Sequence, residues 1–360
     1  MKKILFISPS LGSGGAERQM TTMACILKEM GYIVEFLCFL QDDFYEHILK
    51  KSGVRVNRIK KSNNISLMFA ARKFICSNKF DVTISFLEGA NFINIFSSLG
   101  NKQRKVITGM RNSDESIFYN FKNRIFCFFQ RYADFIVCNS ENAKQMWIKH
   151  YPQYEYKLKV IYNTIIIQPI STTYIPKKGG KLNILIPASY QYIKNPKGVI
   201  EALNLLSKNQ RNNIIVDWYG STSSVGTFKV YTECCDLIKK YGLSNVIRLN
   251  QSSPFIHEKM NEADVVALLS RHEGLPNAIC EGLTIGKPII MSRVSDYSSL
   301  VDGLNGFLVD WDDYEEIKNT FVKMSNLNVE QLLALGKHSK EISNKLFSKN
   351  NTINKWISLM

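Results

Sequence analysis

Short apolar runs alternate along the chain with longer segments in which apolar residues recur every three or four positions. The short runs are rich in Ile, Val and Phe and predict buried strands, whereas the longer segments predict amphipathic helices. Alternation of this kind is typical of an α/β fold with a parallel sheet. In the first half it predicts strands at residues 2–9, 33–39, 81–86, 105–108, 135–138 and 159–163.

The same pattern restarts after an interruption at residues 165–181. This segment, IIIQPISTTYIPKKGGK, contains two prolines and two glycines and has no amphipathic period, so we interpret it as a linker. Further strands are predicted at 183–188, 214–219, 246–249 and 263–270. We expect two Rossmann-like domains facing a cleft: residues 1–165, a linker at 166–181 and residues 182–342, with a C-terminal helix at 343–360 packing back on the first domain.

One predicted helix carries more aromatic residues than a single core-facing stripe needs. Residues 115–132, ESIFYNFKNRIFCFFQRY, interleave aromatic with basic side chains. Two interpretations remain open: the helix is buried inside the domain, or part of it rests on a membrane surface or an apolar acceptor.

Composition favours a folded chain without a membrane span. Of the 360 residues 45% are hydrophobic, yet no apolar run reaches the roughly 18 to 20 residues that a bilayer requires. The N-terminus, MKKILFISPS, continues into a glycine-rich loop and a helix, so it predicts a first strand and not a signal peptide. The eight cysteines lack C-x-x-C spacing and the five histidines lack H-x-H or HExxH patterns, so we expect free thiols in a reducing cytoplasm, without disulfides or a metal site.

The net charge of +15 is unevenly distributed. Residues 48–80 contain nine Lys and Arg and no acidic residue, and residues 101–160 contain eleven basic against five acidic residues. Basic patches attract phosphates, whether of nucleic acid, of anionic lipid or of a lipid-linked substrate. A solvated basic face is the alternative for each cluster.

A glycine-rich loop follows the first predicted strand. It reads LGSGGAER at residues 11–18 and precedes a helix expected at 19–30. Glycines at the carboxyl edge of a doubly wound sheet allow φ > 0 or a close approach of the backbone to a phosphate. The dinucleotide fingerprint G-x-G-x-x-G fails because Glu17 stands at its third glycine, which disfavours a dehydrogenase.

Two glutamates in the second half flank a turn that is suited to start a helix. Glu273 follows the strand predicted at 263–270, and Glu281 comes eight positions later. Proline is favoured at the first helical position, so we expect a helix from Pro276 with Glu281 inside it. Leu275, at the expected cap position, offers no side-chain acceptor, which leaves the first-turn amides and the positive end of the helix for an anion such as a phosphate. An ordinary turn with two solvated glutamates is the alternative.

Three motifs, taken in order, resemble those of the family-4 glycosyltransferases of GT-B fold. They are GGAER at 14–18, Lys194-Asn195 in the first loop of the second half, and EGLPNAICE at 273–281, which is followed by GKPII and by DGLNGFLV at 302–309. The resemblance covers nearly the whole chain. It implies a retaining, metal-independent transfer of a sugar from a nucleotide-sugar donor, without a cofactor and with UDP as the expected nucleotide.

The resemblance also implies roles for individual residues. Breaking a sugar–phosphate bond leaves negative charge on the diphosphate and builds positive charge at the anomeric carbon. Lys194 and helix amides are expected to neutralise the first, Glu273 to orient the sugar, and Glu281 to accept hydrogen bonds from the ribose. We expect Glu273, Lys194 and Arg111 to be catalytic, and the donor to contact Gly14, Gly15, Ser189, Lys194, Gly220, Gly274, Leu275, Pro276, Asn277 and Glu281.

The chain departs from the family pattern at three places. Ser189 stands where the family often has an arginine, and the segment SDYSS at 295–299 replaces G-G-x-x-E. Where many members have a histidine near the donor sugar, this chain reads TGMRN at 108–112, in which Arg111 is either a ligand of a phosphate or acceptor, or a structural arginine. These departures leave open a nucleotide-sugar-binding relative or scaffold without turnover.

The expected acceptor is a glycan or lipid-linked glycan of bacterial capsule or O-antigen synthesis. The basic and aromatic segments of the first half favour an anionic membrane surface as a further partner, so we expect a cytoplasmic protein that is peripheral on the inner face of the cell membrane. No nucleic-acid recognition motif is present, and nucleic acid is not an expected partner.

Overall fold

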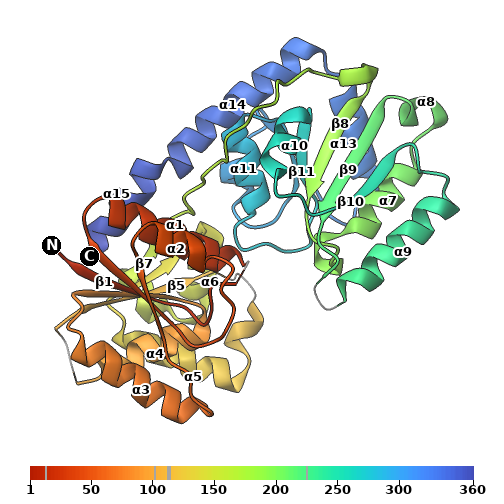
Figure 1. The fold of residues 1–360 in the computed structure, drawn as a ribbon. Coiled ribbons are helices and arrows are strands. Elements are labelled where there is room, and N and C mark those ends of the chain that lie inside the picture. The colour runs from red at the N-terminus through yellow and green to blue at the C-terminus, as the bar shows by residue number, and fades with distance from the viewer. Residues whose placement is uncertain (13, 101–102, 112–114, 224–225) are drawn as a thin grey trace. The chain divides into compact units, whose positions relative to one another are not determined.

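The computed structural model describes residues 1–360 except 13, 101–102, 112–114 and 224–225, and it divides into two compact units (Figure 1). Unit 1 comprises Met1–Thr164 with Lys349–Met360, and unit 2 comprises Ile165–Ser348. Ser13 of the glycine-rich loop and Asn112 next to Arg111 lie outside the described residues.

Unit 1 is built on a seven-stranded parallel sheet of order β3-β2-β1-β4-β5-β6-β7. Its strands are β1 (Lys3–Ile7), β2 (Ile33–Cys38), β3 (Arg55–Arg58), β4 (Val82–Phe86), β5 (Lys105–Met110), β6 (Phe135–Cys138) and β7 (Leu158–Val160). Its helices are α1 (Gly15–Glu29), α2 (Glu46–Lys51), α3 (Asn64–Ser77), α4 (Glu88–Ser98), α5 (Phe121–Phe129), α6 (Glu141–His150) and α15 (Lys349–Leu359).

The two faces of this sheet are covered by different helices, because successive strand residues point to opposite sides. On β1, Ile4 and Phe6 join a core cluster with residues of α1, α2 and α15. Leu5 and Ile7 join a second cluster with residues of α3 and α4. The apolar runs of the sequence are therefore buried on both sides, as a parallel sheet requires.

Unit 2 is built on a six-stranded parallel sheet of order β10-β9-β8-β11-β12-β13. Its strands are β8 (Leu182–Pro187), β9 (Ile214–Gly220), β10 (Ile247–Gln251), β11 (Val265–Leu268), β12 (Ile289–Ser292) and β13 (Gly306–Val309). Its helices are α7 (Pro196–Asn204), α8 (Lys208–Arg211), α9 (Thr227–Lys240), α10 (Ile256–Glu262), α11 (Asn277–Ile285), α12 (Tyr297–Leu300), α13 (Tyr314–Ser325) and α14 (Val329–Phe347). The predicted class of two Rossmann-like α/β domains is confirmed.

The strand order of each sheet reverses at one point. In unit 1 the chain moves outward in opposite directions from β1 and β4, and in unit 2 from β8 and β11. Open α/β sheets bind ligands beyond the carboxyl ends of the strands at such a point. The glycine-rich loop follows β1, and the loops that carry Lys194 and Glu273 follow β8 and β11, so these predicted site residues lie at the two switch points.

The predicted helix at 115–132 is wrong in its continuity. The structure has 3₁₀ turns at Glu115–Phe118 and Gln130–Tyr132 on either side of α5. Asn120 causes the break before α5, because its side chain accepts a hydrogen bond from the Lys122 amide and caps a new helix. Its aromatic residues also divide: Phe118 is buried against Trp147, whereas Tyr119 and Phe121 are exposed.

The predicted C-terminal helix at 343–360 is also interrupted. Residues 343–347 form the C-terminal end of α14, which belongs to unit 2. Only α15 packs in unit 1, where Ile353 and Trp356 join the core around β1 and α1. Ser348 separates the two helices because its ψ of 136° is extended. Buried Phe347 and buried Trp356 therefore belong to different cores.

In the described residues, no helix has the length and apolar character needed to cross a membrane.

Candidate active site

Three loops lie together at the carboxyl edge of the unit 2 sheet. They follow the adjacent strands β8, β11 and β12. The Arg271 amide donates a hydrogen bond of 2.8 Å to the Ile193 carbonyl, and the Ser295 hydroxyl donates one to the Gly274 carbonyl. These bonds tie the loop of Glu273 to both of its neighbours.

Lys194 and Glu273 form an ion pair in this loop cluster. The Lys194 Nζ lies 2.6 Å from Glu273 Oε1, and the side chains are 23% and 10% exposed. Ser270 Oγ donates a second hydrogen bond of 2.6 Å to the same carboxylate oxygen. A partly buried pair is screened less by water and salt than a surface pair. The sequence placed these two groups on separate loops, and the structure brings them into direct contact.

The backbone after Lys194 explains the Lys-Asn pair. Asn195 has a φ of 61°, in the left-handed region where asparagine is tolerated better than most residues. Its side-chain amide donates a 2.6 Å hydrogen bond to the Trp311 carbonyl, and Pro196 begins α7 directly after it. A Cβ at Gly198 would come within 2.4 Å of the Asn195 side chain, so a glycine lets α7 close over this turn.

Helix α11 begins one residue later than predicted. Pro276 takes the cap position and Asn277 is the first helical residue, with no side-chain cap hydrogen bond among the described residues. The positive end of the helix therefore lies next to the Glu273 loop without a side-chain cap, as expected. Leu275 is buried, and Glu281 lies inside the helix with 6% of its surface exposed. Glu281 is thus not the solvated glutamate of the alternative interpretation.

Ser189 and Gly220 lie on the neighbouring strand ends. Gly220 ends β9, and a Cβ there would come within 2.2 Å of the Ala188 carbonyl oxygen and 3.2 Å of the Ser189 Cα. The Trp218 indole donates a 2.6 Å hydrogen bond to the same carbonyl. Glycine is required here because the loop after β8 crosses close above the end of β9. Contact of these residues with a donor stays a prediction.

Gly14 and Gly15 begin α1 in unit 1. Gly14 is the cap residue and Gly15 the first helical residue, and no side-chain cap bond is present among the described residues. The φ of Gly14 is −72°, so this glycine is not needed for a left-handed conformation. A Cβ there would meet the Glu17 carboxylate at 2.3 Å, and because this carboxylate ends a flexible side chain, the contact alone does not require glycine.

Arg111 lies at the end of β5 in unit 1 and is enclosed by aromatic rings. Its guanidinium carbon is 3.6 Å from the centre of the Phe86 ring and 5.9 Å from that of Trp356. One nitrogen donates a 3.1 Å hydrogen bond to Asn163, whereas Nε is buried without a partner in the described part of the chain. Burial lowers the pKa of Arg111 to about 9, so the group stays cationic at neutral pH.

Two residues of the site, Ser270 and His257, carried no sequence signal, and a third, Ser295, was noted only as a departure from the family pattern. Ser270 bonds Glu273, and Ser295 bonds the Gly274 carbonyl from a φ of 57° that replaces the expected glycine conformation. His257 of α10 lies 3.6 Å from the Glu281 carboxylate. A strand-end serine and a helix histidine recur too widely for their types alone to indicate a site.

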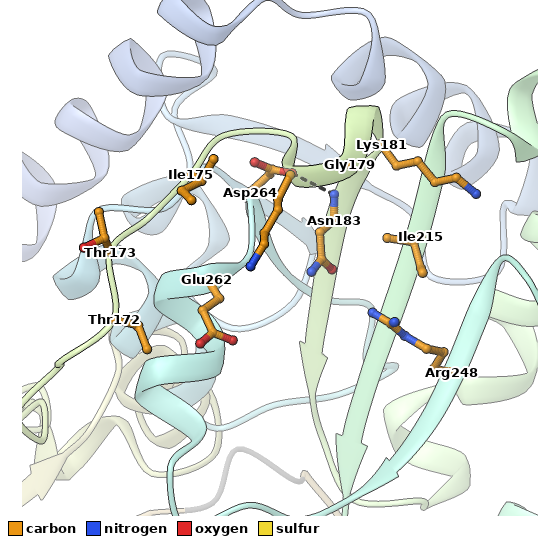
Figure 2. Close-up of a pocket in the computed structure, with 11 residues that line it drawn as sticks. Thr172, Thr173, Ile175, Gly179, Lys181, Asn183, Ile215, Arg248, Glu262 and Asp264 are labelled. Atoms are coloured by element: carbon orange, nitrogen blue, oxygen red, sulfur yellow. Dashed lines mark hydrogen bonds between the residues drawn. The ribbon is translucent and has the colours of Figure 1, made fainter.

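A cavity of about 460 Å³ lies at the opposite edge of the unit 2 sheet (Figure 2). Asn183, Ile215 and Arg248 line it from the amino ends of β8, β9 and β10. Asp264 closes one side, because its carboxylate accepts 2.8 Å hydrogen bonds from the Tyr174 hydroxyl and from the amides of residues 177 and 183. Asp264 thus fixes the linker to the sheet, and the cavity does not include the predicted site residues.

All eight cysteines are free thiols, and no cluster of three or more His, Cys, Asp or Glu in the described residues is arranged to hold a metal ion.

Two family descriptions match the chain. "Glycosyltransferase Family 4" matches residues 13–168, and "Glycosyl transferases group 1" matches residues 173–342, so that between them they span both units. The chain belongs to the family-4 glycosyltransferases of GT-B fold. The predicted resemblance is confirmed.

This glycosyltransferase is similar to curated proteins along most of its length. It is 26% identical over 327 residues to a Campylobacter jejuni enzyme named GalNAc-alpha-(1->4)-GalNAc-alpha-(1->3)-diNAcBac-PP-undecaprenol alpha-1,4-N-acetyl-D-galactosaminyltransferase, covering 87% of this chain and 86% of that protein. It is 23% identical to the Escherichia coli O-antigen biosynthesis glycosyltransferase WbnH, covering 90% and 95% of the two chains.

The fold of this glycosyltransferase is shared with solved structures. HepE of Anabaena in complex with UDP superposes with a TM-score of 0.83 at 19% identity, covering 99% of this chain and 98% of that chain. The apo lipopolysaccharide outer core galactosyltransferase WaaB superposes with a TM-score of 0.77 at 13% identity, covering 99% and 98%. At such identities the likeness supports the fold alone.

Proposed function

We propose that this glycosyltransferase moves a hexose or N-acetylhexosamine from a UDP-linked donor to a lipid-linked saccharide, with retention of anomeric configuration. The observation that carries the proposal is the Lys194–Glu273 pair beside the uncapped start of α11, at the carboxyl edge where such sheets bind ligands. The pair supplies an ammonium and a carboxylate, which are suited to the two opposite charges that the reaction develops.

Lys194 and the α11 N-terminus are suited to the diphosphate. An incoming phosphate competes with Glu273 for the Lys194 ammonium, and the helix amides and dipole add to its stabilisation. These groups supply the positive charge that the leaving diphosphate needs, so we propose transfer without a metal.

Glu273 is suited to the donor sugar once Lys194 engages the phosphate. Its carboxylate remains held by Ser270, so it keeps its position while it accepts hydrogen bonds from sugar hydroxyls and stabilises positive charge at the anomeric carbon. The acceptor hydroxyl then attacks from the face that the diphosphate leaves, and the leaving phosphate takes its proton. That path yields retention without a covalent intermediate.

The relatives support the substrate class. The Campylobacter jejuni relative is named for a substrate linked to undecaprenol through a diphosphate, the Escherichia coli relative for O-antigen synthesis, and HepE was solved with UDP. We propose by analogy a lipid-linked glycan acceptor in cell-surface polysaccharide synthesis.

A surface of unit 1 supports a peripheral membrane location. Around α5, the aromatic side chains of Tyr119, Phe121 and Phe128 are 67%, 78% and 50% exposed. Lys122 and Arg124 lie among them, and both are exposed. Exposed aromatic residues among cations fit an anionic interface, so we propose that this surface rests on the cytoplasmic face of the cell membrane.

The test of the reaction is transfer from a panel of UDP-, GDP- and dTDP-sugars to a short-chain lipid diphosphate saccharide, followed by mass spectrometry. We expect one UDP-sugar to be consumed in the presence of EDTA, with the anomeric signal of the product unchanged in configuration by NMR. Binding of UDP with no turnover of any donor would favour the scaffold alternative, and inversion would overturn the front-face mechanism.

The test of the membrane surface is co-sedimentation with vesicles of phosphatidylglycerol or phosphatidylcholine. We expect binding to the anionic vesicles, weaker binding for Phe121→Ser combined with Phe128→Ser, and no change for Phe255→Ser, an exposed aromatic of unit 2. Equal binding to both vesicle types would contradict the proposal.

A further inference from the structure

His257 of α10 lies between the linker and the glutamate assigned to the donor's ribose. The backbone amide of Gln168 donates a 3.0 Å hydrogen bond to His257 Nδ1. Because Nδ1 acts as the acceptor, the neutral ring carries its proton on Nε2. On that side Nε2 lies 3.6 Å from Glu281 Oε2.

This contact is enclosed and incomplete. His257 is 5% exposed and Glu281 6% exposed, and nothing in the described residues accepts a hydrogen bond from His257 Nε2. A distance of 3.6 Å is too long for a hydrogen bond. A buried N–H that lacks an acceptor is costly, and a shift of under about 1 Å would bring the Glu281 carboxyl oxygen within hydrogen-bond distance of it.

The packing of two neighbouring helices keeps His257 and Glu281 close enough for a small movement to form this hydrogen bond. His257 is on α10 and Glu281 on α11, which contact each other directly. Gln168 belongs to the segment of unit 2 that follows Thr164, the last residue of the first part of unit 1. The ring thus connects the position of the linker backbone to the orientation of a carboxylate in the candidate active site.

We propose that His257 is a positioning residue that holds Glu281 toward the ribose of the donor and bridges it to the linker at Gln168. Donor binding shortens the Nε2 to Oε2 distance to a hydrogen bond, and Glu281 presents its other oxygen to the ribose hydroxyls. This inference rests on the proposed function, since it assumes a nucleoside diphosphate donor.

Calorimetric titration with UDP and 2′-deoxyUDP tests the proposal, because only UDP carries the 2′-hydroxyl that would donate a hydrogen bond to Glu281. His257→Asn keeps an acceptor at the Nδ1 position and loses the donor at Nε2. His257→Gln keeps a donor near Nε2. We expect His257→Asn to lower the affinity for UDP about tenfold and the affinity for 2′-deoxyUDP by less than about threefold. His257→Gln should keep most of the wild-type affinity for UDP.

A double-mutant cycle with Glu281→Ala separates positioning from general loosening. In the Glu281→Ala background, His257→Asn should no longer change UDP affinity, because the carboxylate that the ring orients is gone. Gln168→Pro, which deletes the amide that bonds Nδ1 without altering α10, should weaken UDP binding selectively but less than His257→Asn does, because the donor at Nε2 remains.

The possible outcomes distinguish the positioning role of His257 from the proposed use of a UDP-linked donor. Equal loss for both nucleotides, no loss in His257→Asn, or an additive cycle would overturn the positioning role while leaving the proposed function standing. If the wild type bound neither nucleotide, the UDP donor would be refuted and this inference with it.

Discussion

Each unit has a cation at the carboxyl end of a strand near its switch point, and the two are held in opposite ways. Lys194 of unit 2 bonds a carboxylate at 2.6 Å and is partly exposed. Arg111 of unit 1 is stacked on Phe86 and bonds the neutral amide of Asn163. The partner therefore differs: in unit 2 it is a charge that a phosphate can replace, and in unit 1 it is an aromatic ring.

This difference suggests a rule: a cation at a strand end can bind an anionic substrate only if the substrate can replace the cation's partner in the protein. Releasing Lys194 from Glu273 leaves both groups available to a donor of opposite charges. Releasing Arg111 would remove its contacts with the rings of Phe86 and Trp356, and Trp356 belongs to the unit 1 core. We therefore propose a catalytic role for Lys194, whereas the catalytic role predicted for Arg111 stays a prediction, with packing of unit 1 as its alternative.

The largest effect is expected from breaking the unit 2 pair. Glu273→Gln and Lys194→Met should each lower kcat by about 10³-fold, because each removes a charge that the transition state needs. The double variant should be no worse than about tenfold below either single variant, since groups that act together are not additive. Steady-state rates with the donor found in the panel measure this.

The control for this pair is Glu330→Gln, an exposed carboxylate on α14, which should leave rate and melting temperature unchanged. A Glu273→Gln protein with wild-type turnover would refute the proposal that unit 2 supplies the catalytic charges.

The next effect concerns the packing role of unit 1. Trp356→Ala removes a side chain that is 2% exposed and should destabilise unit 1 by about 3–5 kcal/mol, as deletions of buried aromatic residues do. Affinity for UDP should stay the same, because Lys194, Glu273 and Glu281 are in unit 2. Urea denaturation with calorimetric UDP binding at low urea measures both.

Phe347→Ala is the matched control, since Phe347 is also 2% exposed but ends α14 in unit 2. We expect it to destabilise unit 2 and to weaken UDP binding. If Trp356→Ala instead weakened UDP and Phe347→Ala did not, the division of roles between the units would be wrong.

The sequence predicted what depends on local pattern. Many strand positions followed from β-branched apolar runs, although β3 (Arg55–Arg58) and β13 (Gly306–Val309) were not predicted. The start of α11 followed from Pro276 to within one residue. The family motifs located Lys194 and Glu273, although not their direct contact. These two residues are 79 positions apart, and their contact depends on the pairing of β8 with β11.

The failures are of a different kind. One continuous helix at 115–132 was predicted, but the side chain of Asn120 caps a new helix and so ends that continuity. The helix at 343–360 failed because residues on either side of Ser348 pack into separate cores, which no local signal reveals. His257 was missed because its significance comes from the approach of the linker amide and Glu281 in space.

A third effect tests whether stacking compensates for burial of a cation. Lys287 of unit 2 is 2% exposed, with its Nζ 3.3 Å from the centre of the Tyr174 ring, and burial lowers its pKa to about 8. Its pKa in the unfolded chain is about 10.4. Between these values the unfolded state binds the extra proton, so unfolding free energy should rise with pH through this window and be lowest below pH 8.

The measurement is urea denaturation of the wild type and of Lys287→Met at pH 7.5 and pH 10.5. Groups that titrate in both proteins cancel in the difference. The wild type should gain about 3 kcal/mol relative to Lys287→Met over this range. The Lys287 ammonium also donates a 2.6 Å hydrogen bond to the Asn261 carbonyl. A constant difference would mean that this bond and the Tyr174 ring offset the cost of burying the charge, so that burial of a stacked cation would cost no stability.

The smallest effect is expected at Arg111 itself. Arg111→Met keeps an apolar chain against Phe86 and Trp356 and removes a desolvated charge whose Nε is buried without a described partner, so stability should change by less than about 1 kcal/mol. Turnover should be unchanged for the same reason. Arg131→Met, an exposed arginine over Phe128, is the matched control for loss of a ring stack alone. A fall in kcat of more than tenfold in Arg111→Met, with melting unchanged, would show that Arg111 contacts substrate and that unit 1 also contributes a charge to the reaction.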